Sequence, residues 1–243
     1  MIQPRRGMVL AAGLSRRMRP LTDHTAKPLL RIHGKTLLDH ALDRLAEAGV
    51  ELAVVNAHWH ADQIEAHLKA RRAPPRTVVR REEELLETGG GVRAALPLLG
   101  EDPFYVVNGD AFWLDGPVPA LERLAVNFAL GGAESVLLLQ RTSQVQADVG
   151  LGDFALDKWG VPRRRGEREI VPYIYAGVHL MAPALLEGLQ SGCFSMNVAW
   201  DHAMAVGRLR AVVHDGIWFH LSSPRDLEQA EEMLQEYAGG LRK

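Results

Sequence analysis

Short apolar runs alternate with helix-like segments along the first part of the chain, and this alternation constrains the fold more than any other feature. The runs, apolar at nearly every position, are 7–12, 52–55, 104–107 and 136–139. Such runs are typical of strands that are buried on both faces. Between them, apolar residues recur every three or four positions, as in 37–48, where Gly49 ends the pattern. The sequence therefore predicts an α/β fold with a mostly parallel sheet and helices on both faces.

The second half of the chain is less regular. We expect it to extend a Rossmann-like sheet with mixed or antiparallel strands, and no long linker or internal repeat divides the chain. The remaining predicted strands are 78–79, 151–156, 173–180, 209–213 and 217–221. The remaining predicted helices are 61–69, 92–98, 118–130, 183–189, 198–206 and 224–237, and a glycine run at 89–91 opens the second of them.

Composition excludes several classes of protein. Of 243 residues, 47% are hydrophobic and 24% are charged, which is ordinary for a water-soluble globular protein. The net charge of −2 gives no reason to expect nucleic acid or an anionic membrane as a partner. Cys193 is the only cysteine, which fits a reducing cytosol, so we expect a cytoplasmic protein. The apolar run 8–12 is too short for a signal peptide, and no stretch approaches the roughly 20 apolar residues of a membrane span.

The segment after the first strand carries the most chemistry. Residues 10–22 read LAAGLSRRMRPLT, and Lys27-Pro28 follows five residues later. Gly13 lets the backbone approach a ligand closely, and exposed N–H groups in such a turn bind anions. Three arginines and Lys27 add the charge that a triphosphate requires. The alternative is an ordinary strand-to-helix turn with a solvated basic face. The pattern matches neither the P-loop nor the dinucleotide fingerprint.

This segment resembles the signature of the sugar-phosphate nucleotidylyltransferases, an Ala-Ala-Gly turn, then Gly-x-x-x-Arg-Met-x-Pro-Leu-Thr, then Lys-Pro. The resemblance continues through Glu-Thr-Gly-Gly-Gly at 87–91, Asn-Gly-Asp at 108–110, and Trp218 followed by a helix that starts with proline. Within the family, the chain is most similar to the bacterial N-acetylmuramate-1-phosphate uridylyltransferases of cell-wall recycling. Mannose-1-phosphate guanylyltransferases are the alternative group.

The resemblance implies a nucleotide-diphospho-sugar transferase-like fold and a reaction. The enzyme would transfer a nucleotidyl group from an NTP to a sugar 1-phosphate, releasing pyrophosphate and forming an NDP-sugar. UTP with N-acetylmuramate 1-phosphate is the expected pair, and GTP with mannose 1-phosphate is the alternative. A nucleotide-sugar-binding protein without activity is a further alternative. We expect one domain over 1–243, with a nucleotide-binding part over about 1–140 and a sugar-binding part and terminal helix over about 141–243.

By the same resemblance, Arg17, Lys27 and Asp110 are the expected catalytic residues. Arg17 would hold the β- and γ-phosphates, and Lys27 would bridge the α-phosphate and the sugar phosphate. The nucleotide-binding residues would be Leu10, Ala11, Ala12, Gly13, Ser15, Arg16, Arg17, Lys27, Glu87, Thr88, Gly89 and Gly90. Within this set, the segment that starts at Glu87 would line the nucleobase. The sugar-binding residues would be Asn108, Gly152 and Gly177.

Asp110 is also the expected ligand for Mg²⁺, or for Mn²⁺ in its place. It follows an apolar strand, and ligands in open α/β sheets bind beyond the carboxyl ends of strands. The alternative is a turn aspartate, because Asn-Gly-Asp is also a turn sequence. His220 stands where the resembled family carries a second aspartate ligand, and Ala26 stands where it carries a proline. Either one metal bound by Asp110 suffices, or His220 contacts phosphate or a metal such as Mn²⁺ or Zn²⁺, or activity is lost.

Overall fold

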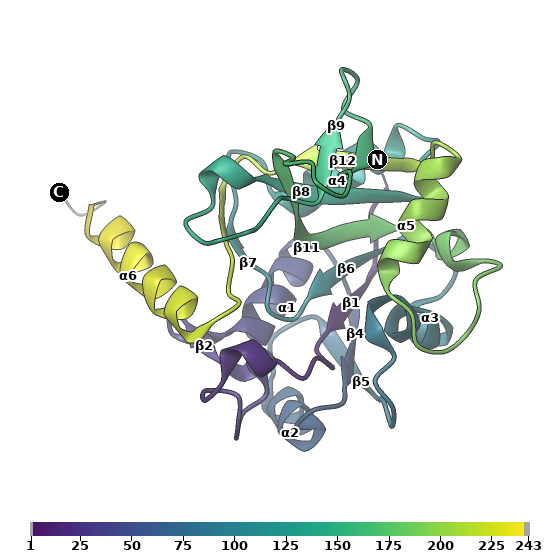
Figure 1. Ribbon diagram of the computed structural model, residues 1–243. Helices are drawn as coiled ribbons and strands as arrows, with labels where there is room; N and C mark the ends of the chain where they lie inside the picture. Colours follow the sequence, from purple (N-terminus) through teal and green to yellow (C-terminus); the bar gives the residue numbers. More distant parts are fainter. Residues whose placement is uncertain (1, 241–243) are drawn as a thin grey trace.

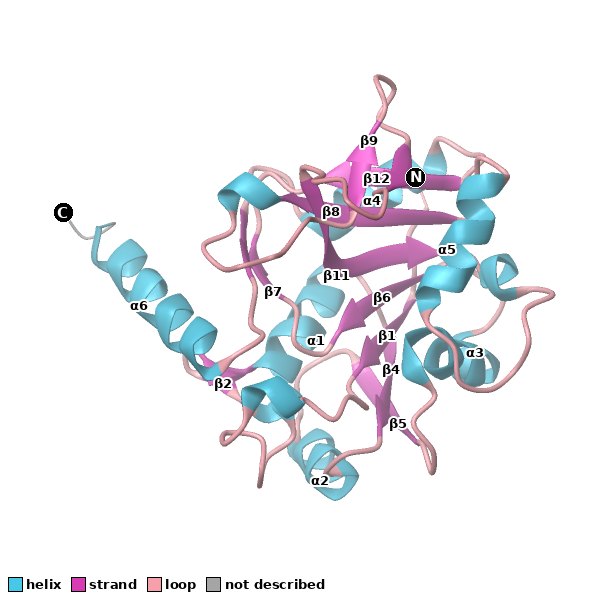
Figure 2. Cartoon of the chain, in the orientation of Figure 1, coloured by secondary structure: helices cyan, strands magenta, loops and turns pink. Residues whose placement is uncertain are grey.

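The computed structural model describes residues 2–240 and is built around one mixed sheet of nine strands (Figures 1 and 2). The strands are β1 (Arg6–Leu10), β4 (Leu52–Ala57), β5 (Arg76–Arg81), β6 (Phe104–Asn108), β8 (Ser135–Arg141), β9 (Phe154–Leu156), β10 (Pro162–Arg164), β11 (Tyr173–Met181) and β12 (Leu209–Val213). In one half of the sheet, β6, β1, β4 and β5 lie side by side and run parallel.

In the other half of the sheet, β11 is the central strand and pairs antiparallel with β6, β8 and β9. Because β12 is parallel to β8 and β10 is antiparallel to β9, only β10 and β11 run against the other seven strands. The predicted α/β class, with a mostly parallel sheet and a mixed extension, is confirmed.

Helices cover both faces of the sheet. They are α1 (Leu37–Glu47), α2 (Ala61–Ala70), α3 (Glu87–Leu99), α4 (Ala120–Ala129), α5 (Met196–Ala205) and α6 (Pro224–Gly240). Along β1, Val9 belongs to the core formed with α1, α2 and α4, whereas Met8 belongs to the core formed with α3 and α5. Successive strand residues face opposite sides, so a strand buried on both faces reads as a continuous apolar run.

Two short strand pairs lie outside the nine-stranded sheet, and one of them ties the C-terminal part of the chain to the body. One joins β2 (Arg31–Ile32) to β3 (Lys35–Thr36), and the other joins β7 (Phe112–Leu114) to β13 (Ile217–Phe219). A third apolar cluster includes Ile32, Phe112 and Phe219 and packs against Ala230 and Leu234 of α6. In the described part of the chain, no helix is long and apolar enough to cross a bilayer.

The structure differs from the sequence prediction at several element boundaries. The helix predicted at 183–189 is one 3₁₀ turn, Pro183–Leu186, because Glu187 is extended and Gly188 has a positive φ of 72°. The strand predicted at 151–156 is reduced to β9, and α3 begins at Glu87 rather than at residue 92. The short strands β2, β3, β7 and β10 were not predicted, because two or three residues carry no periodicity.

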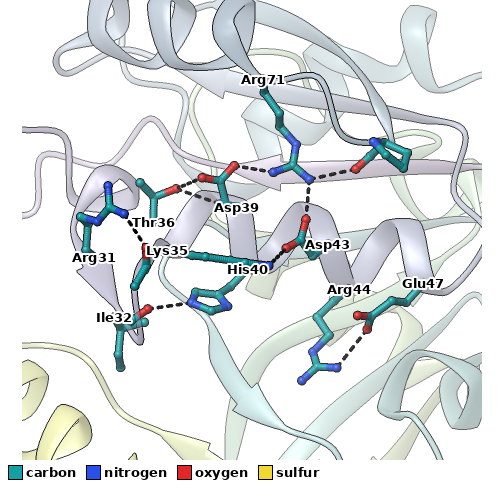
Figure 3. Close-up of polar contacts among 12 residues, drawn as sticks. Arg31, Ile32, Lys35, Thr36, Asp39, His40, Asp43, Arg44, Glu47 and Arg71 are labelled. Carbon is teal, nitrogen blue, oxygen red and sulfur yellow. Dashed lines mark hydrogen bonds and ion pairs between the residues drawn. The ribbon is translucent and has the colours of Figure 1, made fainter.

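A polar network ties the end of α2 to the outer face of α1 (Figure 3). Arg71 follows α2, and its guanidinium donates to Asp39 and to Asp43 of α1, with N···O distances of 2.5 Å. Thr36 caps α1, since its Oγ1 accepts from the Asp39 N–H at 3.0 Å. These contacts hold α2 against α1, on the face of the sheet where α2 can reach the loop before Lys27.

The inner face of α1 should contribute much more to stability than exposed apolar residues do. Leu42 is fully buried in the core, whereas Leu130, just after α4, is 79% exposed. We expect Leu42→Ala to lower the free energy of unfolding by about 2–5 kcal/mol, because it removes buried methyl groups and leaves a cavity. The matched control Leu130→Ala should change it by less than about 0.5 kcal/mol. Urea unfolding followed by circular dichroism measures both, and equal effects would contradict this description of the core.

Candidate active site

Three neighbouring strands end at the same level. In the parallel register, Leu10 at the end of β1 pairs with Asn56 of β4 on one side and with Asn108 of β6 on the other. Parallel strands present their carboxyl ends at one edge of a sheet, where ligands of open α/β folds bind. The loops that follow these strands therefore open onto a common space.

Two cavities lie at this edge and meet at three residues. The first has a volume of about 340 Å³ and the second about 200 Å³. Lys27, Asn108 and Asp110 line both of them. The shared residues thus include Lys27, which is predicted to bridge the nucleotide and the sugar phosphate.

An ion pair between Lys27 and Asp110 stands at this junction. The Lys27 Nζ and Asp110 Oδ2 atoms are 2.5 Å apart. The Lys27 side chain is 9% exposed and the Asp110 side chain is 40% exposed. The pair is therefore held on the lysine side by the fold and remains open to a ligand on the aspartate side.

The loop that leads to Lys27 is anchored by α2. Gln63 of α2 accepts a hydrogen bond from the Ala26 N–H at 3.2 Å, and its Nε2 donates to the His24 carbonyl at 2.8 Å. Proline has no N–H and could not make the first of these bonds. Ala26, which departs from the resembled family, therefore gains an anchor through Gln63.

The first cavity is lined by eight of the predicted nucleotide-binding residues, which are Leu10, Ala11, Ala12, Gly13, Ser15, Lys27, Glu87 and Thr88. Two of them hold unusual backbone conformations, with φ of 51° at Ser15 and 57° at Glu87. Non-glycine residues in this region cost about 1–3 kcal/mol each and cluster at ligand sites. The loop around Ser15 is fixed by the buried Thr22, whose Oγ1 donates to the Ser15 carbonyl at 2.9 Å.

Three of the predicted nucleotide-binding residues do not line either cavity: Arg16, Gly89 and Gly90. The two glycines pack against the segment before α5, where both N–H groups donate to the Phe194 carbonyl. A Cβ atom at Gly90 would lie 2.1 Å from the Gly192 carbonyl oxygen. The close approach of the backbone at 192–194 explains why glycine stands at these two positions. Their contact with a nucleobase stays a prediction.

The second cavity gathers Arg17, Asn108, Gly177 and His220 around the junction. Gly177 has a φ of 78°, and a Cβ atom there would approach the Asn108 side chain to 3.2 Å. Gly152 lies outside the lining and packs against the Val171 carbonyl. The structure thus brings Arg17, Lys27, Asp110 and two of the three predicted sugar-binding residues together.

His220 lies where burial disfavours its charged form. Burial lowers the pKa of His220, and the positive charges of Arg17 and Lys27 lower it further. Asp226 and Asp110 oppose this effect without cancelling it. In its neutral form, the imidazole can donate or accept a hydrogen bond beside Arg17 and Lys27 without repelling either cation.

Metal ligands are sparse in this region. Over the described residues, no three His, Cys, Asp or Glu side chains gather as a metal site. Asp110 offers a partly exposed carboxylate at the junction, and Asp153 lines the second cavity. One or two carboxylates completed by water and substrate phosphate are the usual protein contribution to Mg²⁺ binding, so these residues fit that ion.

The sequence prediction missed Asn56, Ser195, Asp153 and Tyr175, which also line the cavities. Asp153 accepts from the Tyr175 N–H at 2.9 Å, and the Tyr175 hydroxyl contacts His179 Nδ1 at 2.7 Å. A signal for Asn56 exists in the sequence, because Val-Val-Asn occurs at both 54–56 and 106–108, each time at a strand end. No comparable signal marks the other three.

With this geometry established, comparison with known proteins defines the class. A family model for the MobA-like NTP transferase domain matches residues 7–192, more than half of the chain. The chain therefore belongs to the MobA-like NTP transferase family and is a nucleotidyltransferase.

Two curated relatives narrow the class. An N-acetylmuramate alpha-1-phosphate uridylyltransferase from Caulobacter vibrioides is 41% identical over 237 residues, covering 96% of this chain and 98% of the relative. A protein of the same name from Neisseria meningitidis serogroup B is 33% identical over 233 residues, covering 94% and 97%. The predicted resemblance to sugar-1-phosphate nucleotidylyltransferases is confirmed.

A solved structure supports the fold independently. Apo UDP-glucose pyrophosphorylase matches with a TM-score of 0.79 and 15% identity, covering 96% of this chain and 98% of that chain. At this identity the likeness concerns the fold alone, and it agrees with the predicted fold class.

The buried histidine beside the second cavity should make the protein sensitive to acid. Burial lowers the pKa of His179 to about 3. The pKa of a histidine in an unfolded chain is about 6.5. Between about pH 3 and about pH 6.5, the unfolded chain binds more protons at this histidine than the folded chain does. The free energy of unfolding therefore keeps its full value above about pH 6.5 and decreases below it, by up to about 1.4 kcal/mol per pH unit.

We expect His179→Gln to flatten this dependence, because glutamine keeps a hydrogen bond to Tyr175 but does not titrate. The control His202→Gln replaces an exposed histidine of α5 and should leave the slope unchanged. Urea unfolding at a series of pH values from about 6 to 4 measures the slope. An unchanged slope in the His179 variant would contradict the role given to burial.

Proposed function

We propose that this protein joins a sugar 1-phosphate to the α-phosphorus of an NTP and releases pyrophosphate. A sugar-phosphate oxygen forms the new bond to the α-phosphorus, while the bond from that phosphorus to the bridging oxygen of pyrophosphate breaks. The observation that carries the proposal is the junction of two cavities at Lys27, Asn108 and Asp110. One cavity would take the nucleotide and the other the sugar phosphate.

The proposed roles of the charged residues follow from the substrates. The attacking phosphate oxygen is already an anion, so the reaction needs no general base. The main obstacle is the repulsion between two polyanions that must meet in line. Lys27 lines both cavities and would contact both phosphates. Arg17 lines the second cavity, but it belongs to the loop whose residues Gly13 and Ser15 line the first, and from there it would stabilise the charge that develops on the leaving pyrophosphate.

A divalent metal, Mg²⁺ or Mn²⁺ in its place, belongs to the proposal. Asp110 would hold it together with oxygens of the triphosphate. When bound, the ion neutralises negative charge on the phosphates and makes the α-phosphorus easier to attack. Because imidazole suits Mg²⁺ poorly, we assign His220 to phosphate contact rather than to a second ion.

We further propose UTP and N-acetylmuramate 1-phosphate as the substrates. Support comes from the two relatives, both uridylyltransferases for that sugar phosphate, which this chain matches over nearly their full length. One domain over 1–243, divided near residue 140 between nucleotide and sugar binding, is part of the same proposal. So is a cytoplasmic location, where NTPs are available.

Loss of either cation at the junction should stop turnover. We expect Arg17→Ala and Lys27→Met each to lower kcat/KM by at least about 100-fold, because each removes a group that stabilises transition-state charge. The control Arg19→Ala removes a cation of the same loop that pairs with Asp23 outside both cavities, and should keep activity. Pyrophosphate release gives the rate, and circular dichroism verifies the fold. Near-normal rates in both variants would contradict the proposed roles.

Substrate choice is tested by a matrix of four NTPs against several sugar 1-phosphates, each with Mg²⁺ and with Mn²⁺. We expect the highest kcat/KM for UTP with N-acetylmuramate 1-phosphate, measured by pyrophosphate release. A preference for GTP with mannose 1-phosphate would replace the proposed pair. Nucleotide binding without turnover in every combination would contradict the proposed reaction.

A further inference from the structure

A buried chain of hydrogen bonds runs along the wall of the first cavity, which one of its members, Asn56, also lines. Asn56 Oδ1 accepts from the Ala11 N–H at 2.8 Å, and Asn56 Nδ2 donates to Glu82 Oε1 at 2.7 Å. The other carboxylate oxygen, Glu82 Oε2, accepts from the Leu86 N–H at 3.2 Å. The chain thus runs from the loop after β1, through the end of β4, to the segment that leads into α3.

The two central residues are sealed from solvent. Asn56 is 2% exposed and Glu82 is 4% exposed. Gly91 of α3 packs against them, and a Cβ atom there would lie 2.8 Å from Asn56 Nδ2 and 3.0 Å from Glu82 Oε1. A buried polar group is costly unless it is hydrogen-bonded, so a broken link in this chain leaves an unpaired group that water cannot reach.

Both ends of the chain belong to the wall of the first cavity. Ala11 lies in the loop that lines one side, and Leu86 sits between Leu85 and Glu87, which line the other side. The predicted roles of the lining residues place the triphosphate at the side of Ala11 and the base at the side of Leu85 and Glu87. The distance between the two sides then decides whether one nucleotide can contact both.

We propose that Asn56 and Glu82 are a positioning pair for the nucleotide, holding the triphosphate-binding loop and the segment before α3 at the separation that an NTP requires. This inference rests on the proposed function for the identity of the ligand. The pair acts through the backbone groups of Ala11 and Leu86 and contributes to nucleotide affinity rather than to sugar binding.

The chemistry of the pair allows an exchange experiment. In N56D, a carboxylate faces the Glu82 carboxylate and cannot donate to it. In E82Q, an NH2 group replaces one of the two carboxylate oxygens, so it faces either the Asn56 amide or the Leu86 N–H, and neither donor can bond to it. In the double variant N56D/E82Q, the carboxylate at position 56 accepts from Ala11 and from the new amide, whose oxygen accepts from Leu86. Every hydrogen bond and the net charge are thereby restored.

Binding of UTP without sugar phosphate is measured by titration calorimetry, and KM is measured separately for each substrate. We expect each single variant to weaken UTP binding about tenfold or more, and the double variant to return to within about threefold of the original protein. The KM for the sugar 1-phosphate should stay within about twofold in all three. The control E83Q changes an exposed neighbour and should bind UTP normally.

The proposal would be overturned if the double variant bound UTP no more tightly than the single variant with the lower UTP affinity. Equal increases in the KM for UTP and the KM for the sugar 1-phosphate would also overturn it. If a single variant fails to fold, the comparison of the double variant with the other single variant still decides. Failure of the proposed function is a distinct result. In that case the original protein releases no pyrophosphate with any pair, while NTP binding by the four proteins still reports on the positioning pair.

Discussion

The register of three parallel strands is the constraint on which the site depends. Because Leu10 pairs with both Asn56 and Asn108, the strands β4, β1 and β6 end together, and the loops that follow them open onto one edge of the sheet. Side chains alternate along a strand, so a slip of one residue would turn both asparagines to the opposite face. Met8 and Val9 of β1 are buried in different cores, so a slip of β1 would also exchange their packing partners.

Electrostatics divides the site in a way that matches two anionic substrates. The Lys27–Asp110 pair occupies the junction, with its lysine held by the fold and its aspartate partly open. Arg17 and His220 stand on the side of the second cavity, where burial lowers the pKa of the imidazole. At the junction the charge of Lys27 is balanced by Asp110, whereas Arg17 adds a positive charge on the side of the second cavity. The buried Glu82 contributes through its hydrogen bonds.

Much of the fold follows from local patterns. Continuous apolar runs indicate buried strands, and the three- to four-residue spacing in 37–48 indicates the helix α1, because these patterns report the surroundings of each residue directly. The short strands β7 and β10 and the 3₁₀ turn Pro183–Leu186 escaped prediction. Their conformations are set by pairing partners and by a following glycine, which leave no periodic signal.

The sequence by itself determined the α/β class, the basic loop after the first strand and the resemblance to a nucleotidyltransferase, because these depend on contiguous residues. Only the tertiary structure decided which of those residues meet. Lys27 and Asp110 are 83 positions apart, and Asn56 and Glu82 are 26 apart, so their contacts exist only once the strands pair in register. The same folding turned Gly89 and Gly90 away from the cavity and brought Asp153 and Tyr175 into it.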